Sequence, residues 1–214
     1  MCWNETVSLN TFLFSSFVLL LIIYNNAFTK YKITELNNIW IYLFIASFIF
    51  MQLIECFIWR NIHNKFYNNL FSIIGVCLLI SQPIFSIMIL SKTSLRNKLL
   101  FSYLLLALPY SIYKFLTKNI HSAVSKGGHL VWNFFENPPI VSFIWLFFFL
   151  FSFIYEKKWI GILFSTTTLL LAYYNYKNDN SMWSLWCWMV NSAMIYYAVY
   201  LLIFLPFFEK GNIC

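Results

Sequence analysis

Long apolar runs, separated by short polar segments, make up most of the chain. Each run is continuous, which is typical of membrane-spanning helices, whereas the strands of a membrane barrel would alternate apolar and polar residues. Seven runs approach the length of a membrane span, roughly 17–25 residues, and end at charged or turn residues. They cover about Leu9–Tyr24, Ile39–Trp59, Asn68–Leu90, Leu99–Leu116, Ile140–Tyr155, Trp159–Tyr174 and Trp183–Phe207. We therefore expect an all-α fold, a polytopic transmembrane bundle of about seven helices.

Composition supports a chain that has lipid as its main solvent. Hydrophobic residues make up 61% of the 214 residues, charged residues 10%, and the mean hydropathy is +0.72. Soluble domains are about 45–50% apolar and about 25% charged. Seven spans leave room only for termini and loops, so we expect one transmembrane domain over 1–214, with the lipid bilayer as its partner.

The longest connection, at about 117–139, contains Gly127-Gly128 and a half-apolar stretch from His129 to Glu136. We expect a short helix there, lying in the membrane interface with its aromatic side chains at the level of the lipid head groups. On such a helix His129, Asn133 and Glu136 would share one face. Asn is a poor zinc ligand, so we expect no metal at this face.

The net charge of +7 does not indicate nucleic-acid binding, because the basic residues lie in short loops between the apolar runs. With the N-terminus outside, the inner loops and C-terminus carry about eight Lys and Arg, against about six on the outer side. The positive-inside rule therefore favours an outside N-terminus. The first run lacks a basic segment before it and a clear cleavage site after it, so we expect a retained signal-anchor helix.

Familiar chemical signatures are absent from the sequence. No two of the five cysteines form a C-x-x-C pair, so neither a disulfide framework nor a zinc site is expected. Gly-rich phosphate loops, H-E-x-x-H and G-x-S-x-G do not occur, and the last run has no lysine for a retinal Schiff base. We expect no cofactor and assign no catalytic residue on these grounds.

Glu55 is the residue that most clearly indicates a functional site. It lies five residues before Arg60 in the second run, so at about 1.5 Å per residue it is roughly 7 Å inside the helix end. An acid inside a span costs a few kcal/mol and is a candidate functional residue by default. The alternative is a structural acid that pairs with another helix or reaches the nearer interface. Gln52 lies one turn away, so we expect this face to point into the bundle.

Alternating helix directions bring other polar and aromatic residues to the membrane level of Glu55. These residues are Tyr110, Trp188 and Asn191 in the spans, and His129 and Trp132 in the long connection. We expect Glu55 to hydrogen-bond to Asn191, Trp188 or Tyr110. Trp183 and Trp186, by contrast, are typical of an interfacial tryptophan belt.

Gln82 lies deeper, about 20 Å along its helix. It either lines the inner part of a cavity or satisfies the carbonyl groups that Pro83 leaves without a donor. We therefore predict one ligand-binding pocket near one face of the bundle. Its residues are Gln52, Glu55, Trp59, Gln82, Tyr110, His129, Trp132, Trp188 and Asn191.

Three short motifs carry a resemblance to a known group of proteins. They are Gln52-x-x-Glu55-x-x-x-Trp59, Gln82-Pro83 and Trp186-Cys187-Trp188-x-x-Asn191. Together they resemble a small, uncharacterised polytopic membrane protein family of large DNA viruses and protists, which implies no known activity. The size and span number also resemble the SWEET sugar transporters, but Gln82-Pro83 reverses the order of their Pro-Gln pairs.

Three functional hypotheses follow from these residues. The first is a non-enzymatic, multi-pass membrane protein that binds or transports a small solute, lipid or ion in the polar pocket. The second is a membrane-embedded hydrolase that uses Glu55 and His129. The third is a structural or host-membrane protein without a ligand. The sequence is compatible with a monomer or an oligomer in each case.

Overall fold

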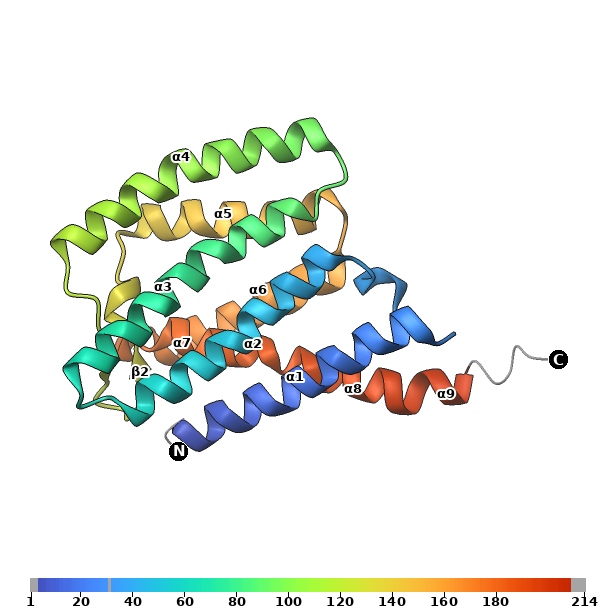
Figure 1. Cartoon of the computed structure of the whole chain (residues 1–214), viewed down its shortest axis with the longest axis horizontal. Coiled ribbons are helices and arrows are strands. Elements are labelled where there is room, and N and C mark those ends of the chain that lie inside the picture. The colour runs from blue at the N-terminus through green and yellow to red at the C-terminus, as the bar shows by residue number, and fades with distance from the viewer. Residues whose placement is uncertain (1–3, 31, 209–214) are drawn as a thin grey trace.

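The computed structural model describes residues 4–30 and 32–208, and these residues form a helical bundle (Figure 1). Its longer helices are α1 (Glu5–Phe28), α2 (Ile39–Arg60), α3 (Lys65–Met88), α4 (Thr93–Thr117), α5 (Pro139–Tyr155) and α6 (Trp159–Tyr176). A seventh rod joins α7 (Met182–Asn191), α8 (Ala193–Val199), the π-helix η4 (Tyr200–Phe204) and α9 (Leu205–Phe208). Short 3-10 helices lie at Thr34–Leu36 (η1), Asn133–Phe135 (η2) and Lys177–Asp179 (η3), and two strands at Ala123–Val124 (β1) and Leu130–Val131 (β2). The expected all-α bundle is confirmed.

Five of the helical rods are long and apolar enough to cross a membrane, against the seven expected. They are α1, α2, α3, α4 and the rod Met182–Phe207. The helix α5 is apolar but has 17 residues, and α6 has 18 residues that include a run of polar threonines. At about 1.5 Å per residue these two are about 26–27 Å long, slightly less than the roughly 30 Å hydrocarbon core of a bilayer.

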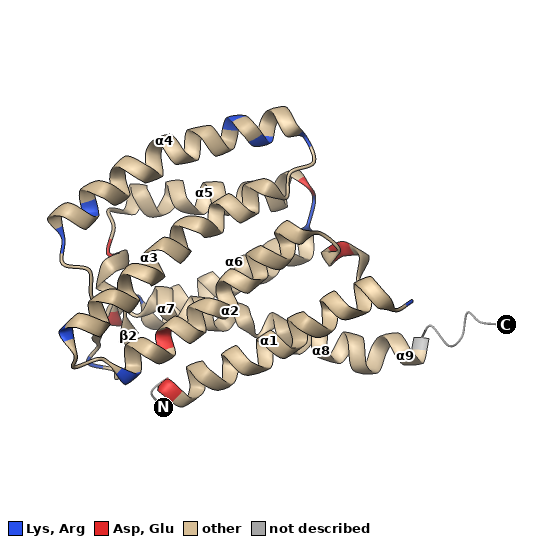
Figure 2. Cartoon of the chain, viewed as in Figure 1, with Lys and Arg blue, Asp and Glu red and all other residues tan. Residues whose placement is uncertain are grey.

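The rods lie side by side and alternate in direction, so the loops gather at two ends of the bundle (Figure 1). The Arg60 end holds residues 61–64, 118–138 and 177–181, together with the start of α1. The Lys158 end holds residues 29–30, 32–38, 89–92 and 156–158. Contacts between loops agree with this arrangement, since Glu156 accepts from Ser91 N at 2.7 Å and Lys158 donates to Glu35 O at 2.9 Å. Charged residues concentrate at the two ends (Figure 2).

Asparagines fix where three of the helices begin. The side chains of Asn4, Asn38 and Asn64 accept hydrogen bonds from backbone N–H groups in the first turns of α1, α2 and α3. These N–H groups have no partner within the helix, and an asparagine cap satisfies them.

The central helix of the bundle is α2. Of its apolar window 61% is buried, against 11% for α4, which lies at the edge (Figure 1). The core around α2 is strongly aromatic. It includes Phe44, Phe48, Phe134, Trp145, Phe149 and Trp186. An acid on the inward face of α2 is therefore enclosed by protein on every side.

The long connection does not form the expected interfacial helix. Residues 118–138, called the plug below, instead fold as a β1–β2 hairpin followed by the 3-10 helix η2. Gly128 takes a φ of 79° in the hairpin turn, a conformation that favours glycine. The aromatic side chains are not at an exposed surface, because Trp132 is 4% and Phe134 1% exposed within the core.

Side chains from the neighbouring helices hold the backbone of the plug. Asn68 donates to Ser122 O at 3.0 Å and accepts from Ser122 N at 2.9 Å. Ser184 donates to Leu130 O, and Lys114 donates to Phe134 O. Irregular backbone is stable inside an apolar bundle only where protein groups satisfy its N–H and C=O groups, as they do here.

Candidate functional site

Gln52 and Glu55 form a buried polar pair on the inward face of α2. Their side chains are 0% and 4% exposed, and Gln52 Nε2 donates to Glu55 Oε2 at 3.0 Å. Their three-residue spacing places both on one helix face, as predicted from the sequence. Glu55 Oε1 and Gln52 Oε1 are buried and accept no hydrogen bond from any described residue. Two oxygen acceptors are thus left open inside an apolar core.

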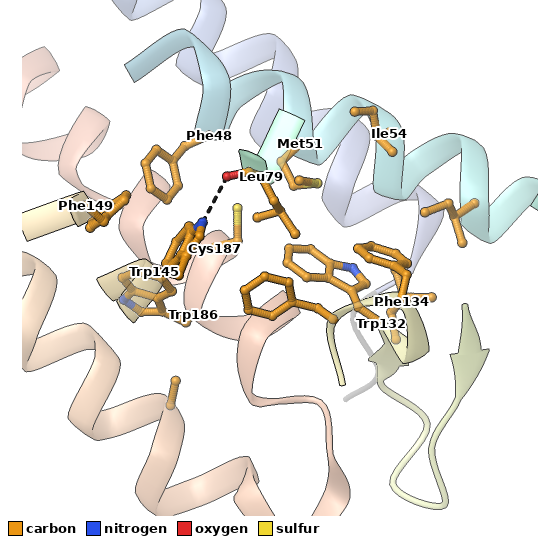
Figure 3. Close-up of a cluster of buried hydrophobic side chains, with 14 of the residues drawn as sticks. Phe48, Met51, Ile54, Leu79, Trp132, Phe134, Trp145, Phe149, Trp186 and Cys187 are labelled. Atoms are coloured by element: carbon orange, nitrogen blue, oxygen red, sulfur yellow. Dashed lines mark hydrogen bonds between the residues drawn. The ribbon is translucent and has the colours of Figure 1, made fainter. Parts of the chain in front are cut away.

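Two further side chains border this pair, one from the plug and one from α7. The indole of Trp132 lies beside the Glu55 carboxyl and close enough to interact with it, but its Nε1–H does not meet hydrogen-bond geometry with a described acceptor. The thiol of Cys187, 2% exposed, lies beside Gln52 and Glu55. Figure 3 shows Trp132 and Cys187 within the same aromatic cluster as Met51. These four groups, Gln52, Glu55, Trp132 and Cys187, are called the Glu55 centre below.

No cationic side chain balances the charge of Glu55. Arg60, the nearest basic residue on α2, pairs instead with Glu5 at 3.5 Å, and both side chains of that pair are exposed. Within residues 4–30 and 32–208, no Lys, Arg or His forms an ion pair with Glu55. An ionised carboxylate that is buried without a counter-charge is very costly. The centre therefore needs a proton or a bound cation to be neutral.

The expected hydrogen bonds from Glu55 to Asn191, Trp188 or Tyr110 do not form. Asn191 donates to Phe48 O, which lies seven residues before Glu55 on α2, and to Cys187 O in its own helix. Trp188 donates to Thr11 Oγ1 on α1. Helix direction alone does not set these partners, because rotation about each helix axis depends on packing.

Two other helix residues of the predicted pocket, Tyr110 and Trp59, make no hydrogen bond to the Glu55 centre within the described chain. Tyr110 lies on the peripheral helix α4 and donates to Asn137 Oδ1 at 2.9 Å. Trp59 is half-buried and packs against the aromatic core. The predicted pocket thus reduces to Gln52, Glu55 and Trp132, with Cys187 added.

Gln82 does not satisfy the carbonyl that Pro83 leaves without a donor. Proline lacks the N–H that would bond to the carbonyl of Leu79, four residues earlier. The indole of Trp145 on α5 donates to Leu79 O instead, at 3.0 Å (Figure 3). The Gln82 amide is 0% exposed, and neither its Oε1 nor its Nε2 bonds to a described residue.

The two histidines of the plug do not approach Glu55. His121 Nε2 lies 2.9 Å from Asn133 Nδ2, and the ring of His129 packs against Tyr176 with its centroid 5.2 Å away. The helical face expected to carry His129, Asn133 and Glu136 does not exist, because this segment is a strand followed by a 3-10 helix. The hydrolase hypothesis therefore finds no support in the contacts of the described imidazoles.

Two cavities lie beside the core, and neither is lined by Glu55 or Gln82. One, of about 230 Å³, lies between α3, α4, α5 and the plug. The other, of about 260 Å³, lies between α2, α6 and the rod of α7 and α8, and includes Asn191 in its lining. The described chain thus holds the Glu55 centre closed, with Trp132 of the plug beside the carboxyl.

Sequence reasoning missed Trp145 and Cys187 as parts of the polar interior. A signal for Trp145 existed, because a proline inside a span frees one carbonyl and so predicts a donor on a neighbouring helix. For Cys187 the sequence offered only its depth in the last span.

No family model, no curated protein and no solved structure matches the chain. The resemblance to membrane proteins of large DNA viruses and protists therefore stays a prediction.

Proposed function

We propose that the chain is a multi-pass integral membrane protein that binds a small monovalent cation, in exchange with a proton, at the Glu55 centre. One observation carries the proposal: Glu55 is buried on α2 with Oε1 open and with no basic partner. Acidic groups inside spans typically mark ion or proton pathways. Binding near one face of such a bundle is the first step of transport.

The donor set favours a monovalent over a divalent cation. Ca²⁺ takes 6–8 oxygen ligands, commonly with several carboxylates. The Glu55 centre offers one carboxylate and the neutral carbonyl oxygen of Gln52. A single positive charge would neutralise this site, and in its absence a proton on Glu55 would do the same.

Access to the centre depends on the plug. Trp132 lies beside the carboxyl at the Arg60 end, and the plug is held by hydrogen bonds from α3, α4 and α7. A cation that enters from this end has to displace the plug. Movement of residues 118–138 is thus the gating step of the proposal.

Cation-dependent thermal stability of the purified protein tests the proposal. Chlorides of Li⁺, Na⁺ and K⁺ are compared with N-methylglucamine chloride at constant ionic strength. We expect one small cation to raise the melting temperature, because binding at about 100 times Kd stabilises by about 2.7 kcal/mol. Acidification should weaken this effect, because a proton occupies the same carboxylate.

Two matched variants decide the outcome. Glu55→Gln keeps the shape of the side chain but loses its charge, so the cation effect should disappear. Glu5→Gln removes the exposed acid at the same end of the bundle, where it pairs with Arg60, and should retain the effect. An equal cation response in wild type and Glu55→Gln, or no response in wild type, would overturn the proposal.

A further inference from the structure

The cavity of about 230 Å³ exists because α4 is fastened to the bundle at two separate places. Midway along α4, Tyr103 is 3% exposed and donates to Ile80 O at 2.8 Å. At the end of α4, Lys114 Nζ donates to Phe134 O at 2.6 Å and Asn137 Oδ1 at 2.6 Å. Between these points Leu106, Ala107 and Tyr110 of α4 line the cavity, together with residues of α3 and α5.

The cationic and amide groups of the lining lie at one end of this cavity, near the plug. Its inner wall is apolar and includes Leu79 and Trp145, both largely buried. Near the plug the lining changes to Tyr110, Lys114 and Asn137. An apolar cavity with a cationic end offers the two environments that a lipid needs, one for a hydrocarbon chain and one for an anionic head group.

We infer that this cavity holds one acyl chain of an anionic phospholipid, with the phosphate near Lys114. The outer face of α4 consists of exposed apolar residues such as Leu105 and Ile112, so hydrocarbon borders the cavity in a bilayer. A void of this size loses the dispersion contacts of its lining, and hydrocarbon restores them. An engineered cavity of about 150 Å³ already binds benzene.

Charge complementarity identifies the head group. The three N–H donors of Lys114 are used by Phe134 O, Glu136 O and Asn137 Oδ1, so Lys114 contributes its positive charge rather than a free donor. Lys118 lies one turn beyond it and is exposed. Two lysines against the single acid Glu136 leave this end positive, which favours phosphate.

This inference is independent of the cation proposal, because Glu55 does not line the cavity. The test is native mass spectrometry of the full-length protein in mild detergent, with equimolar phosphatidylglycerol and phosphatidylcholine of identical chains. Wild type should retain phosphatidylglycerol. Ala107→Trp, which fills the cavity from α4, should lose it. Leu105→Trp places the same indole on the exposed face, 62% accessible in wild type, and should keep it.

A second cavity-filling variant and a second measurement distinguish loss of lipid binding from a folding defect. Val141→Phe fills the cavity from α5 and should also lose the phospholipid, at an unchanged melting temperature. In liposomes, a phosphatidylglycerol with brominated chains should quench wild type more than Trp145→Phe, because Trp145 lines the cavity. Equal retention by Ala107→Trp, Val141→Phe and wild type would overturn the inference, as would equal binding of the two phospholipids or retention of detergent alone.

Discussion

At the scale of single residues, one hydrogen bond between helices compensates for the proline inside α3, and its contribution to stability can be measured. Pro83 leaves Leu79 O without its helical donor, and the indole of Trp145 supplies one across the α3–α5 contact. Helices with an internal proline persist in an apolar medium only if neighbouring groups satisfy the freed carbonyl. The hydrogen bond is therefore a structural link between two helices, and its strength should depend on Pro83.

Trp145→Phe should destabilise the protein by about 1–3 kcal/mol, because it leaves a buried carbonyl without a donor. Pro83→Ala restores a backbone N–H that can bond to Leu79 O. In that background Trp145→Phe should cost about 1 kcal/mol less. A double-mutant cycle of unfolding in detergent measures the coupling. Trp183→Phe, in the same aromatic cluster, is the control and should show no coupling with Pro83→Ala.

The sequence predicts the polar residues well and their partners poorly. Burial of Glu55 follows from the helical face that it shares with Gln52, whereas the expected hydrogen-bond partners did not include Gln52. The partners of Asn191, Trp188 and Tyr110 do not follow, because each depends on how its helix is rotated. Periodicity fixes which residues share a face within one helix, but not which face meets which neighbour.

At the scale of elements, the plug is the segment whose secondary structure the sequence pattern predicts wrongly. Half-apolar stretches with aromatic residues are typical of interfacial helices, and residues 129–136 have that composition. A strand with buried side chains has the same composition when the segment folds into the bundle. The buried partners Asn68 and Ser184, which make this burial possible, are distant in sequence.

Asp179 holds the hairpin of the plug from the loop before α7. It accepts from Ser125 Oγ at 2.6 Å and from Gly127 N at 3.2 Å. The Ser125 hydroxyl, followed by the Gly127 N–H and the nearby His129, lowers the pKa of Asp179 below its ordinary value of 3.8. Because the folded pKa is depressed, this stabilisation is present above pH 3.8 and is lost as the pH falls through the folded pKa.

Acid should therefore loosen the hairpin, and the effect should depend on Asp179. We expect pepsin to cleave the plug of wild type increasingly as the pH falls below 3.8, the ordinary pKa of aspartate. Asp179→Asn keeps one of the two side-chain oxygens that accept hydrogen bonds. Cleavage of this variant should therefore be faster than that of wild type at pH 4 and should change less with acidification. Glu136→Gln removes another acid of the plug and should behave like wild type. An equal acid response of Asp179→Asn and wild type would contradict this role.

At the scale of the whole molecule, seven rods alternate in direction, so the connecting loops lie at the two ends of the bundle (Figure 1). The sequence predicts this order, because each rod has its own apolar run and its own flanking polar residues. The length of an apolar run predicts less well whether its helix crosses the bilayer. The helices α5 and α6 have 17 and 18 residues, and the rod at the C-terminal side continues to Phe207.

If all seven rods cross the bilayer, the loop between α5 and α6 emerges opposite to the plug. Single cysteines replace Ser94, Lys126, Lys157 and Asn178, all exposed, in a chain without its native cysteines. A membrane-impermeant maleimide applied to one side of sealed vesicles should label positions 94 and 157 together, and 126 and 178 only from the other side. Helices about 26–27 Å long cross a core of roughly 30 Å with slight local thinning of the bilayer. Should α5 and α6 instead form a re-entrant pair, position 157 would lie inside the membrane and react from neither side, while position 94 would still be labelled. That result would leave five crossings and would also keep positions 126 and 178 on one side, so position 157 alone distinguishes the two topologies.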